Sequence, residues 1–206
     1  MIRIVVPFYS EFDYLKPSLR ALRATAIPHE VVPVHGSLPA MQRNFGVTGG
    51  ISQKIFQKLD SDISHYLFID SDIAFPSDVV RVMKDAGKDI LGLPYRRHEN
   101  PREFQAGWFG KTVGNLKQRA PDTETGLKKV DFVGTGMLLV SRRALEKMPY
   151  PWFRYGLLEE DGNADLVGED MGFCLLAASH GLDVWCHFDF PVSHRLRVRE
   201  DFDAAY

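Results

Sequence analysis

The segment that decides the fold covers His65–Pro76 and reads HYLFIDSDIAFP. Its first half, Tyr66–Ile69, is apolar on both faces, which is typical of a central strand in a parallel sheet. Its second half places two carboxylates, Asp70 and Asp72, directly after that strand. Because ligands bind beyond the carboxyl ends of strands in open α/β sheets, this pair is a candidate site.

Outward from this segment, short apolar runs alternate with stretches of helical periodicity. We expect strands over Ile2–Val6, Val31–Val34, Tyr66–Ile69 and Asp89–Leu93, and helices over Glu11–Thr25, from Ser37 to about Leu59, and after Pro76-Ser77 with Val79, Val80 and Met83 facing inward. This alternation predicts the α/β class, with a mostly parallel central sheet flanked by helices.

The second half is less regular. From Arg96 to Lys129 it is polar, and we expect a hairpin around Phe104–Phe109 and a mobile loop around Pro121–Lys128. Further on we expect strands over Val130–Val133 and Met137–Val140 around the turn Gly134-Thr135-Gly136, a long connection over Tyr150–Leu166, a helix over Gly168–His180 ended by Gly181, a last strand over Val184–Phe188, and a charged tail from Arg195.

The composition is that of an ordinary globular protein, with 206 residues, 45% of them hydrophobic and 25% charged. We expect one domain over residues 1–206. Lys and Arg number 25 against 27 Asp and Glu, a net charge of −2, so no global field attracts nucleic acid. The two cysteines, Cys174 and Cys186, indicate free thiols, and no apolar run is long enough to span a membrane. We therefore expect a cytoplasmic protein whose function lies in a local site.

Two carboxylates after a strand offer hard oxygen ligands, which suit Mg²⁺ or Mn²⁺ together with phosphate oxygens. The alternative is that Asp70 and Asp72 only cap the helix near Ser77 or form an acidic turn. A second acidic pair, Glu169 and Asp170, begins a helix, where the helix dipole alone would favour it. Its functional interpretation is a general base, and the 3.6-residue period lets only one of the two point squarely into a site.

Together these features resemble the glycosyltransferases of the GT-A fold, in particular the family 2-like group, over most of the chain. The matching segments are IRIVVPFY, the Gln42-Arg43-Asn44 helix start, HYLFIDSDIAFP, KDILGLPYRR, VDFVGTGMLLVSRRALEKMPYPWF and GEDMGFCLLAASHGLDVWCHFDFPVSH. Each motif is moderately specific, but their order and spacing together are highly specific.

The resemblance implies a role for each matching residue. Asp70, Asp72 and His194 would hold Mn²⁺ or Mg²⁺ against the diphosphate of a nucleotide-sugar donor, and Asp170, with Glu169 as the alternative, would be the base of an inverting transfer to a hydroxyl. Donor contacts are implied for Pro7, Tyr9, Arg43, Asp70, Gly134, Thr135 and Gly136. Residues 1–95 would form the nucleotide- and metal-binding half, and residues 96–206 the acceptor-side half with the base and the third ligand.

The chain departs from the group after the second strand, where His35-Gly36-Ser37 replaces the acidic residue that grips uridine in many relatives. This segment therefore does not specify the nucleotide base. The overall resemblance favours a UDP-sugar as donor, with a GDP-sugar as the alternative. The acceptor, which can be a glycan, a lipid-linked molecule or a small molecule, would bind near Arg96–Lys129 and Tyr150–Leu166, in a monomer or a homo-oligomer. Candidate sugar-stacking side chains are Trp108, Trp152, Phe153 and Tyr155, for each of which core packing is the competing role.

Three other functions compete with the enzyme hypothesis. A non-catalytic module that binds sugar nucleotides would need the same cleft, and a sugar-nucleotide pyrophosphorylase would share the α/β half but lacks its glycine- and arginine-rich opening loop here. A phosphatase of the haloacid dehalogenase type needs its aspartate pair after the first strand, whereas two predicted strands precede Asp70 in this chain.

Overall fold

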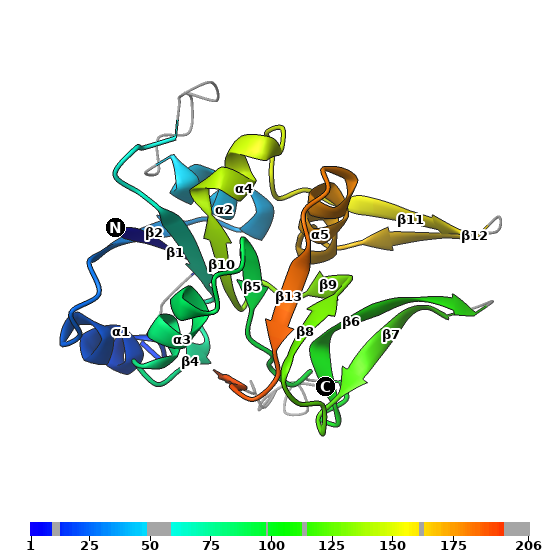
Figure 1. Cartoon of the computed structure of the whole chain (residues 1–206), viewed down its shortest axis with the longest axis horizontal. Helices are drawn as coiled ribbons and strands as arrows, with labels where there is room; N and C mark the ends of the chain where they lie inside the picture. Colours follow the sequence, from blue (N-terminus) through cyan, green and yellow to red (C-terminus); the bar gives the residue numbers. More distant parts are fainter. Residues whose placement is uncertain (10–12, 49–58, 98, 113–114, 161–162, 196–206) are drawn as a thin grey trace, which may run out of the picture.

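A seven-stranded sheet in the order β2-β1-β3-β10-β5-β13-β8 forms the centre of the molecule (Figure 1). The computed structural model describes residues 1–9, 13–48, 59–97, 99–112, 115–160 and 163–195. The strands are β1 (Ile2–Phe8), β2 (His29–His35), β3 (His65–Ile69), β5 (Ile90–Gly92), β8 (Leu127–Val130), β10 (Met137–Ser141) and β13 (Val184–His187). Only β8 and β10 run against the other strands, which confirms the mostly parallel sheet.

Helices cover both faces of the sheet and bury an apolar layer on each (Figure 1). The helices α1 (Lys16–Arg23) and α3 (Val79–Asp85) pack on one face, and α2 (Pro39–Val47), α4 (Arg142–Lys147) and α5 (Glu169–Ser179) pack on the other. In α3 the buried residues are Val79, Val80 and Met83, as the helical spacing predicts. The result is a three-layer α/β/α arrangement.

Three smaller sheets stand at the margins of the central one. The strands β6 (Glu103–Thr112) and β7 (Asn115–Pro121) pair with β9 (Phe132–Val133), β11 (Gly156–Glu160) pairs with β12 (Asn163–Val167), and β4 (Ile73–Ala74) pairs with β14 (Ser193–His194). Figure 1 shows the β6–β7 and β11–β12 hairpins projecting on the same side of the sheet as α5.

The second half therefore holds more regular structure than its sequence predicts. The segment Phe104–Phe109 lies within the single strand β6, so the predicted position of the hairpin is wrong. The predicted strand Val130–Val133 is divided at Asp131 between β8 and β9, which belong to different sheets. The connection Tyr150–Leu166 contains the β11–β12 hairpin, and Pro121–Lys128 is a turn that leads into β8.

Two helices are shorter than their apolar periodicity predicts. The helix α1 begins at Lys16, because Pro17 fixes its backbone in the first turn, and residues 10–12 of the predicted helix lie outside the described residues. The helix α2 ends at Val47, residues 49–58 again lie outside the described part, and Leu59 is not helical. Of the predicted charged tail, only Arg195 is described.

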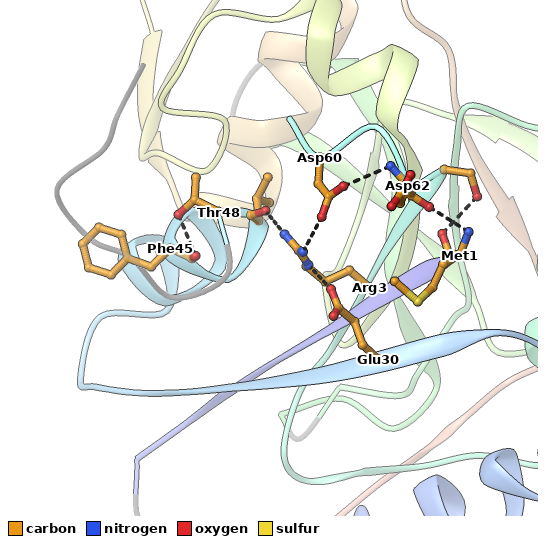
Figure 2. Close-up of polar contacts among 9 residues, drawn as sticks. Met1, Arg3, Glu30, Phe45, Thr48, Asp60 and Asp62 are labelled. Carbon is orange, nitrogen blue, oxygen red and sulfur yellow. Dashed lines mark hydrogen bonds and ion pairs between the residues drawn. The ribbon is translucent and has the colours of Figure 1, made fainter. Parts of the chain in front are cut away.

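Arg3 joins three elements at the edge of the sheet where β1 begins (Figure 2). Its side chain is largely buried, with Nε 2.5 Å from Glu30 Oε1 on β2 and Nη2 3.2 Å from Asp60 Oδ2. Its Nη1 donates to the carbonyl of Val47, the last residue of α2, at 2.8 Å. One guanidinium thus fixes the chain on both sides of residues 49–58.

Candidate functional site

The cleft at the carboxyl end of the central strands has a volume of about 420 Å³. Six segments line it: the end of β1, the loop after β2, α2, the turn after β3, the start of α5, and β14. The lining residues include Pro7, Tyr9, Arg43, Asp70, Asp72, Glu169 and His194. Residues from both halves of the sequence therefore meet at the sheet edge where α/β folds bind ligands.

Asp72 and His194 are brought together by the β4–β14 pair. His194 lies opposite Ile73 in this antiparallel ribbon, and the Arg195 N–H donates to the carbonyl of Asp72 at 2.9 Å. The imidazole Nε2 of His194 is 3.2 Å from Asp72 Oδ2. Burial alone would lower the pKa of His194, but the hydrogen bond and charge of Asp72 outweigh it and raise that pKa.

Arg43 links the two acidic pairs from inside the protein. It projects from α2 with only 2% of its surface exposed, and its Nη2 is 2.5 Å from Asp70 Oδ1. Its Nη1 is 2.8 Å from Glu169 Oε1. Burial lowers the pKa of Arg43, but the two carboxylates overcome this and raise it, so the guanidinium stays charged. The buried cation is therefore compensated by Asp70 and Glu169 together.

The predicted metal ligands are distributed over two contacts. Asp72 and His194 touch each other, whereas the Asp70 carboxylate is bonded to Arg43 in the same cleft. Among the described residues, no three side chains of His, Cys, Asp or Glu converge closely enough to form a metal cage. A carboxylate beside an imidazole is a donor set that suits Mn²⁺ better than Mg²⁺, and phosphate oxygens can complete its coordination.

Helix capping does not explain the first acidic pair. The residue that precedes α3 is Asp78, and its side chain makes no capping hydrogen bond. Asp70 and Asp72 instead bond to Arg43 and His194. Glu169 and Asp170 do occupy the first turn of α5, so the favourable dipole interaction applies to them in addition to any chemistry.

Asp170 differs from Glu169 in its surroundings. Its Oδ1 accepts from the Met171 N–H at 2.7 Å and its Oδ2 accepts from Gln105 Nε2 at 3.2 Å. Burial raises the pKa of Asp170, and the charge of Glu169 adds to this, while the two hydrogen bonds and Arg43 oppose it. A carboxylate with a raised pKa is a better proton acceptor near neutral pH.

Tyr95 fills the space beside the glycine turn. A Cβ at position 134 would lie 2.2 Å from Tyr95 Oη, and one at position 136 would lie 2.5 Å from Tyr95 Cε1. Both positions therefore require glycine for close approach of the ring. Burial raises the pKa of Tyr95 well above its usual range, and Asp70 and Asp170 add to this, so the hydroxyl is neutral. Its ring also packs edge-on against His194 at 5.0 Å.

The end of the cleft near β1 is apolar and aromatic. Tyr9 is 72% exposed and stacks on His35, with ring centroids 6.5 Å apart. Gln42 is buried beneath it and donates to the carbonyls of Phe8 and Val34 at 2.8 and 2.6 Å. This buried amide fixes the loop after β2 against the end of β1.

The four candidate stacking aromatics have different environments. Trp152 and Phe153 are buried in the core, where Phe153 stacks on Phe173 at 4.7 Å, so core packing accounts for both. Trp108 is half-buried and donates its indole N–H to Lys129 O at 3.0 Å. Tyr155 is 60% exposed at the start of the β11–β12 hairpin.

A larger cleft of about 770 Å³ adjoins the first at His194. Its charged side chains pair with one another or with neighbours: Arg96 with Asp122, Arg97 with Glu103, and Glu124 with Lys128. Because these charges already neutralise each other, the lining does not select a ligand by charge.

Sequence reasoning missed Tyr95, Gln105 and Arg119. Tyr95 lies three residues after the end of β5, and its position beyond a predicted strand was a usable signal. Gln105 and Arg119 lie on β6 and β7, and only the cross-strand register places them near Asp170. The two-residue alternation around Phe104 was the local signal for that strand.

The mixed α/β architecture with its mostly parallel central sheet matches the GT-A fold in comparisons with solved structures. The model resembles the A197 protein from STIV with a TM-score of 0.59 and 18% identity, covering 94% of this chain and 85% of that chain. It resembles S. aureus TarS 1–349 in complex with UDP-GlcNAc with a TM-score of 0.57 and 14% identity, covering 100% of this chain and 61% of that chain.

A mutant of Drosophila β1,4-galactosyltransferase 7, in complex with manganese, UDP-Gal and xylobiose, gives a TM-score of 0.53 at 16% identity over 100% of this chain and 76% of that one. At these identities the likeness concerns the fold. No family model matches the sequence, and no curated protein matches it. Within the described ranges, no helix is both long and apolar enough to cross a membrane.

Proposed function

We propose that this chain is a metal-dependent glycosyltransferase that moves a sugar from a nucleoside-diphosphate sugar to a hydroxyl acceptor. The observation that carries the proposal is the meeting of Asp72 and His194 in the same cleft as Arg43, Asp70 and Glu169. This edge of a GT-A fold combines candidate metal ligands with acids beside a polar cleft. Residues 1–95 supply its nucleotide side, and residues 96–206 supply the base and the imidazole.

Asp70, Asp72 and His194 would hold the metal, with Mn²⁺ favoured over Mg²⁺ by the imidazole. The ion would supply Lewis-acid stabilisation of the departing diphosphate. Arg43 has a different role, because its charge is already shared by Asp70 and Glu169. It keeps the Asp70 carboxylate at the cleft wall and fixes α2 relative to α5.

Asp170 is the better candidate for the base. Glu169 is bonded to the Arg43 cation, whereas Asp170 is half-buried near the neutral Tyr95, and desolvation raises its pKa. In the proposed step the acceptor hydroxyl gives its proton to Asp170 as its oxygen attacks the anomeric carbon. The bond from that carbon to the phosphate oxygen breaks, and the nucleoside diphosphate leaves. Attack opposite the leaving group implies inversion.

The nucleotide would lie against Pro7 and Tyr9, with the exposed Tyr9 ring available to stack on a base. Gly134, Thr135 and Gly136 would lie on the sugar side, beside Tyr95. A UDP-sugar is the favoured donor and a GDP-sugar the alternative. The acceptor, whether glycan, lipid-linked or small molecule, would approach from the β6–β7 and β11–β12 hairpins. The free buried thiols of Cys174 and Cys186 favour a cytoplasmic site of action.

The metal assignment is tested by titrating UDP or GDP into the protein, with and without Mn²⁺, and measuring binding by calorimetry. Binding should tighten with Mn²⁺ and lose this metal dependence in Asp72→Ala. Asp85→Ala, an exposed aspartate on α3, is the matched control and should bind like the unmodified chain. Metal-independent binding that is unchanged in Asp72→Ala would refute the metal role.

The base assignment is tested by Asp170→Asn and Glu169→Gln, with release of nucleoside diphosphate as the readout and water or a sugar as acceptor. Asp170→Asn should lose turnover by at least about 100-fold and keep donor binding. Retained turnover in Asp170→Asn would remove it from this role. Tight donor binding without turnover in the unmodified chain would instead favour the non-catalytic module.

A further inference from the structure

Gln105 lies on β6 between two segments of the candidate site, and its backbone is bonded to both. Its N–H donates to Tyr95 O at 2.9 Å, and its carbonyl accepts from the Gly134 N–H at 2.6 Å. The preceding residue, Phe104, is buried on the opposite side of the strand, because side chains alternate along β6. The sheet itself therefore aims the Gln105 side chain at the start of α5.

The Gln105 amide bridges a cation and a carboxylate. Its Nε2 donates to Asp170 Oδ2 at 3.2 Å, and its Oε1 accepts from Arg119 Nη1 at 2.7 Å. A guanidinium can only donate hydrogen bonds and an ionised carboxylate can only accept them. The amide therefore has one orientation that satisfies both neighbours, with its oxygen toward Arg119 and its NH₂ toward Asp170.

Arg119 is held in place without a carboxylate of its own. It lies on β7, and its guanidinium carbon is 5.5 Å from the centroid of the Phe132 ring. Over the part of the chain that the structure describes, no Asp or Glu lies within ion-pair distance of Arg119. Its one hydrogen bond to a side chain goes to Gln105. The Arg119 guanidinium therefore fixes the orientation of the Gln105 amide.

We propose that Gln105 is a positioning residue that fixes the carboxylate of Asp170, and that Arg119 sets the orientation of the Gln105 amide. This inference takes from the proposed function only the role of Asp170 as the base. The Gln105 and Met171 bonds each hold one of the two oxygens of Asp170, so the carboxylate cannot rotate freely. Such restraint keeps the proton acceptor in a productive geometry, in which misplacement of about 1 Å can cost on the order of 100-fold in rate.

Several charged or titratable groups surround Asp170, and each influences its pKa or is influenced by its charge. They are Glu169 beside it on α5, Arg43 from α2, Tyr95 after β5, Arg119 from β7, and Cys174 one turn along α5. In addition to these groups, the uncharged Gln105 on β6 donates a hydrogen bond that lowers the pKa of Asp170. Removing that bond changes no charge, which makes Gln105 the cleanest position for a test.

The test compares Gln105→Met with Gln118→Met, in the intact chain. Methionine matches the length of glutamine but donates no hydrogen bond. Gln118 is exposed on the neighbouring strand β7, so its variant controls for the same chemical change in the same hairpin. Two readouts are used: donor turnover as a function of pH, and ¹³C NMR titration of the Asp170 carboxyl, which needs no enzymatic activity.

In Gln105→Met we expect the Asp170 titration and the acid limb of the turnover profile to move to higher pH. We expect kcat to fall by about 10- to 100-fold while the donor KM stays within about twofold, because Gln105 does not line the donor cleft. Gln118→Met should change neither quantity. An Asp170 titration in Gln105→Met that matches Gln118→Met would overturn the proposal.

The two readouts separate the proposals. If the chain shows no transferase activity but the Asp170 titration moves as expected, the proposed function fails and the positioning role stands. Arg119→Met should give the same direction of change in the titration. In kcat the double variant Gln105→Met/Arg119→Met should be no worse than Gln105→Met alone, because Arg119 orients the Gln105 amide. The titration also senses the direct charge of Arg119, so additive effects of the two substitutions on kcat are the result that would contradict that role of Arg119.

Discussion

Glu169 and Asp170 are adjacent in the sequence and are both half-buried, but the charges around them differ. Glu169 neutralises a buried cation on α2, whereas Asp170 is bonded to an uncharged amide and a backbone N–H. Glu169 forms an ion pair with Arg43, whereas desolvation raises the pKa of Asp170. The same helical turn therefore supplies one structural acid and one candidate base.

Because the pKa of Asp170 is raised, the ionised form of this residue destabilises the folded protein at pH values above its titration. A carboxyl whose folded-state pKa is raised binds its proton more tightly when folded, so stability falls as pH rises from the ordinary aspartate value through the folded one. At neutral pH, Asp170→Asn should therefore stabilise the fold by about 0.5–2 kcal/mol. Urea unfolding at neutral pH and at pH about 3.5 measures this, and the gain should disappear at the lower pH.

Removing the buried cation should have the opposite effect. Arg43→Met leaves Asp70 and Glu169 facing each other without compensation and should cost about 3–5 kcal/mol in unfolding free energy. The same substitution in an Asp70→Asn/Glu169→Gln background should cost less, because no buried charge is then left alone. Urea denaturation of the four chains measures the difference. Equal costs in the two backgrounds would show that the loss comes from packing.

For individual residues, the sequence predicts which residue types stand at the site well, but it predicts poorly which side chains contact each other. The pair after β3 and the pair heading α5 stand at element ends, where strand and helix patterns indicate them directly. The contact of Asp72 with His194 depends on the short pairing of β14 with β4, and the bond from Arg43 to Glu169 depends on how α2 and α5 approach each other. Tyr95 and Gln105 carry no motif and are found only through three-dimensional contacts.

Among the elements, the first half of the fold follows from its apolar runs. Strands β1, β3 and β5 are covered on both faces, so they read as continuous hydrophobic segments. The hairpins β6–β7 and β11–β12 have one face against the protein and one toward solvent, and their polar residues hide the strand pattern. The ribbon β4–β14 has only two residues on each strand, too few for any periodicity.

The position of α5 depends on a glycine contact, which yields a prediction at the scale of the element. A Cβ at Gly172 would lie 1.8 Å from the carbonyl oxygen of Arg154, ahead of β11. Gly172→Ala should therefore move α5 away from this chain segment, costing about 1–3 kcal/mol in stability and lowering turnover with Asp170 displaced. Ala178→Ser, on the exposed side of the same helix, is the control. Thermal unfolding and turnover measure both, and normal values in Gly172→Ala would contradict the close contact.

Over the whole molecule, the two ends of the central sheet have different tasks. The carboxyl ends of β1 and β3 open into the candidate cleft, whereas the opposite ends are joined by the Arg3 cluster of Glu30, Asp60 and the Val47 carbonyl. This cluster ties β1, β2, the end of α2 and the segment leading to β3 (Figure 2). Arg43 lies one helical turn before Val47 in α2, and none of the cluster residues lines the cleft, so the cluster anchors the end of this helix from outside the cleft.

Arg3→Met should therefore reduce stability while sparing the site. It removes the cation from Glu30 and from the exposed Asp60 and leaves the Val47 carbonyl without this donor, so we expect a loss of about 1–3 kcal/mol in unfolding free energy. Arg20→Met, at an exposed position on α1, should change stability by less than about 0.5 kcal/mol. Below the unfolding transition, Arg3→Met should bind the nucleoside diphosphate with unchanged affinity. A large loss of that affinity in a chain that is still folded would mean that the two ends of the sheet are coupled through α2, and that Arg43 responds to a change one helical turn away at Val47.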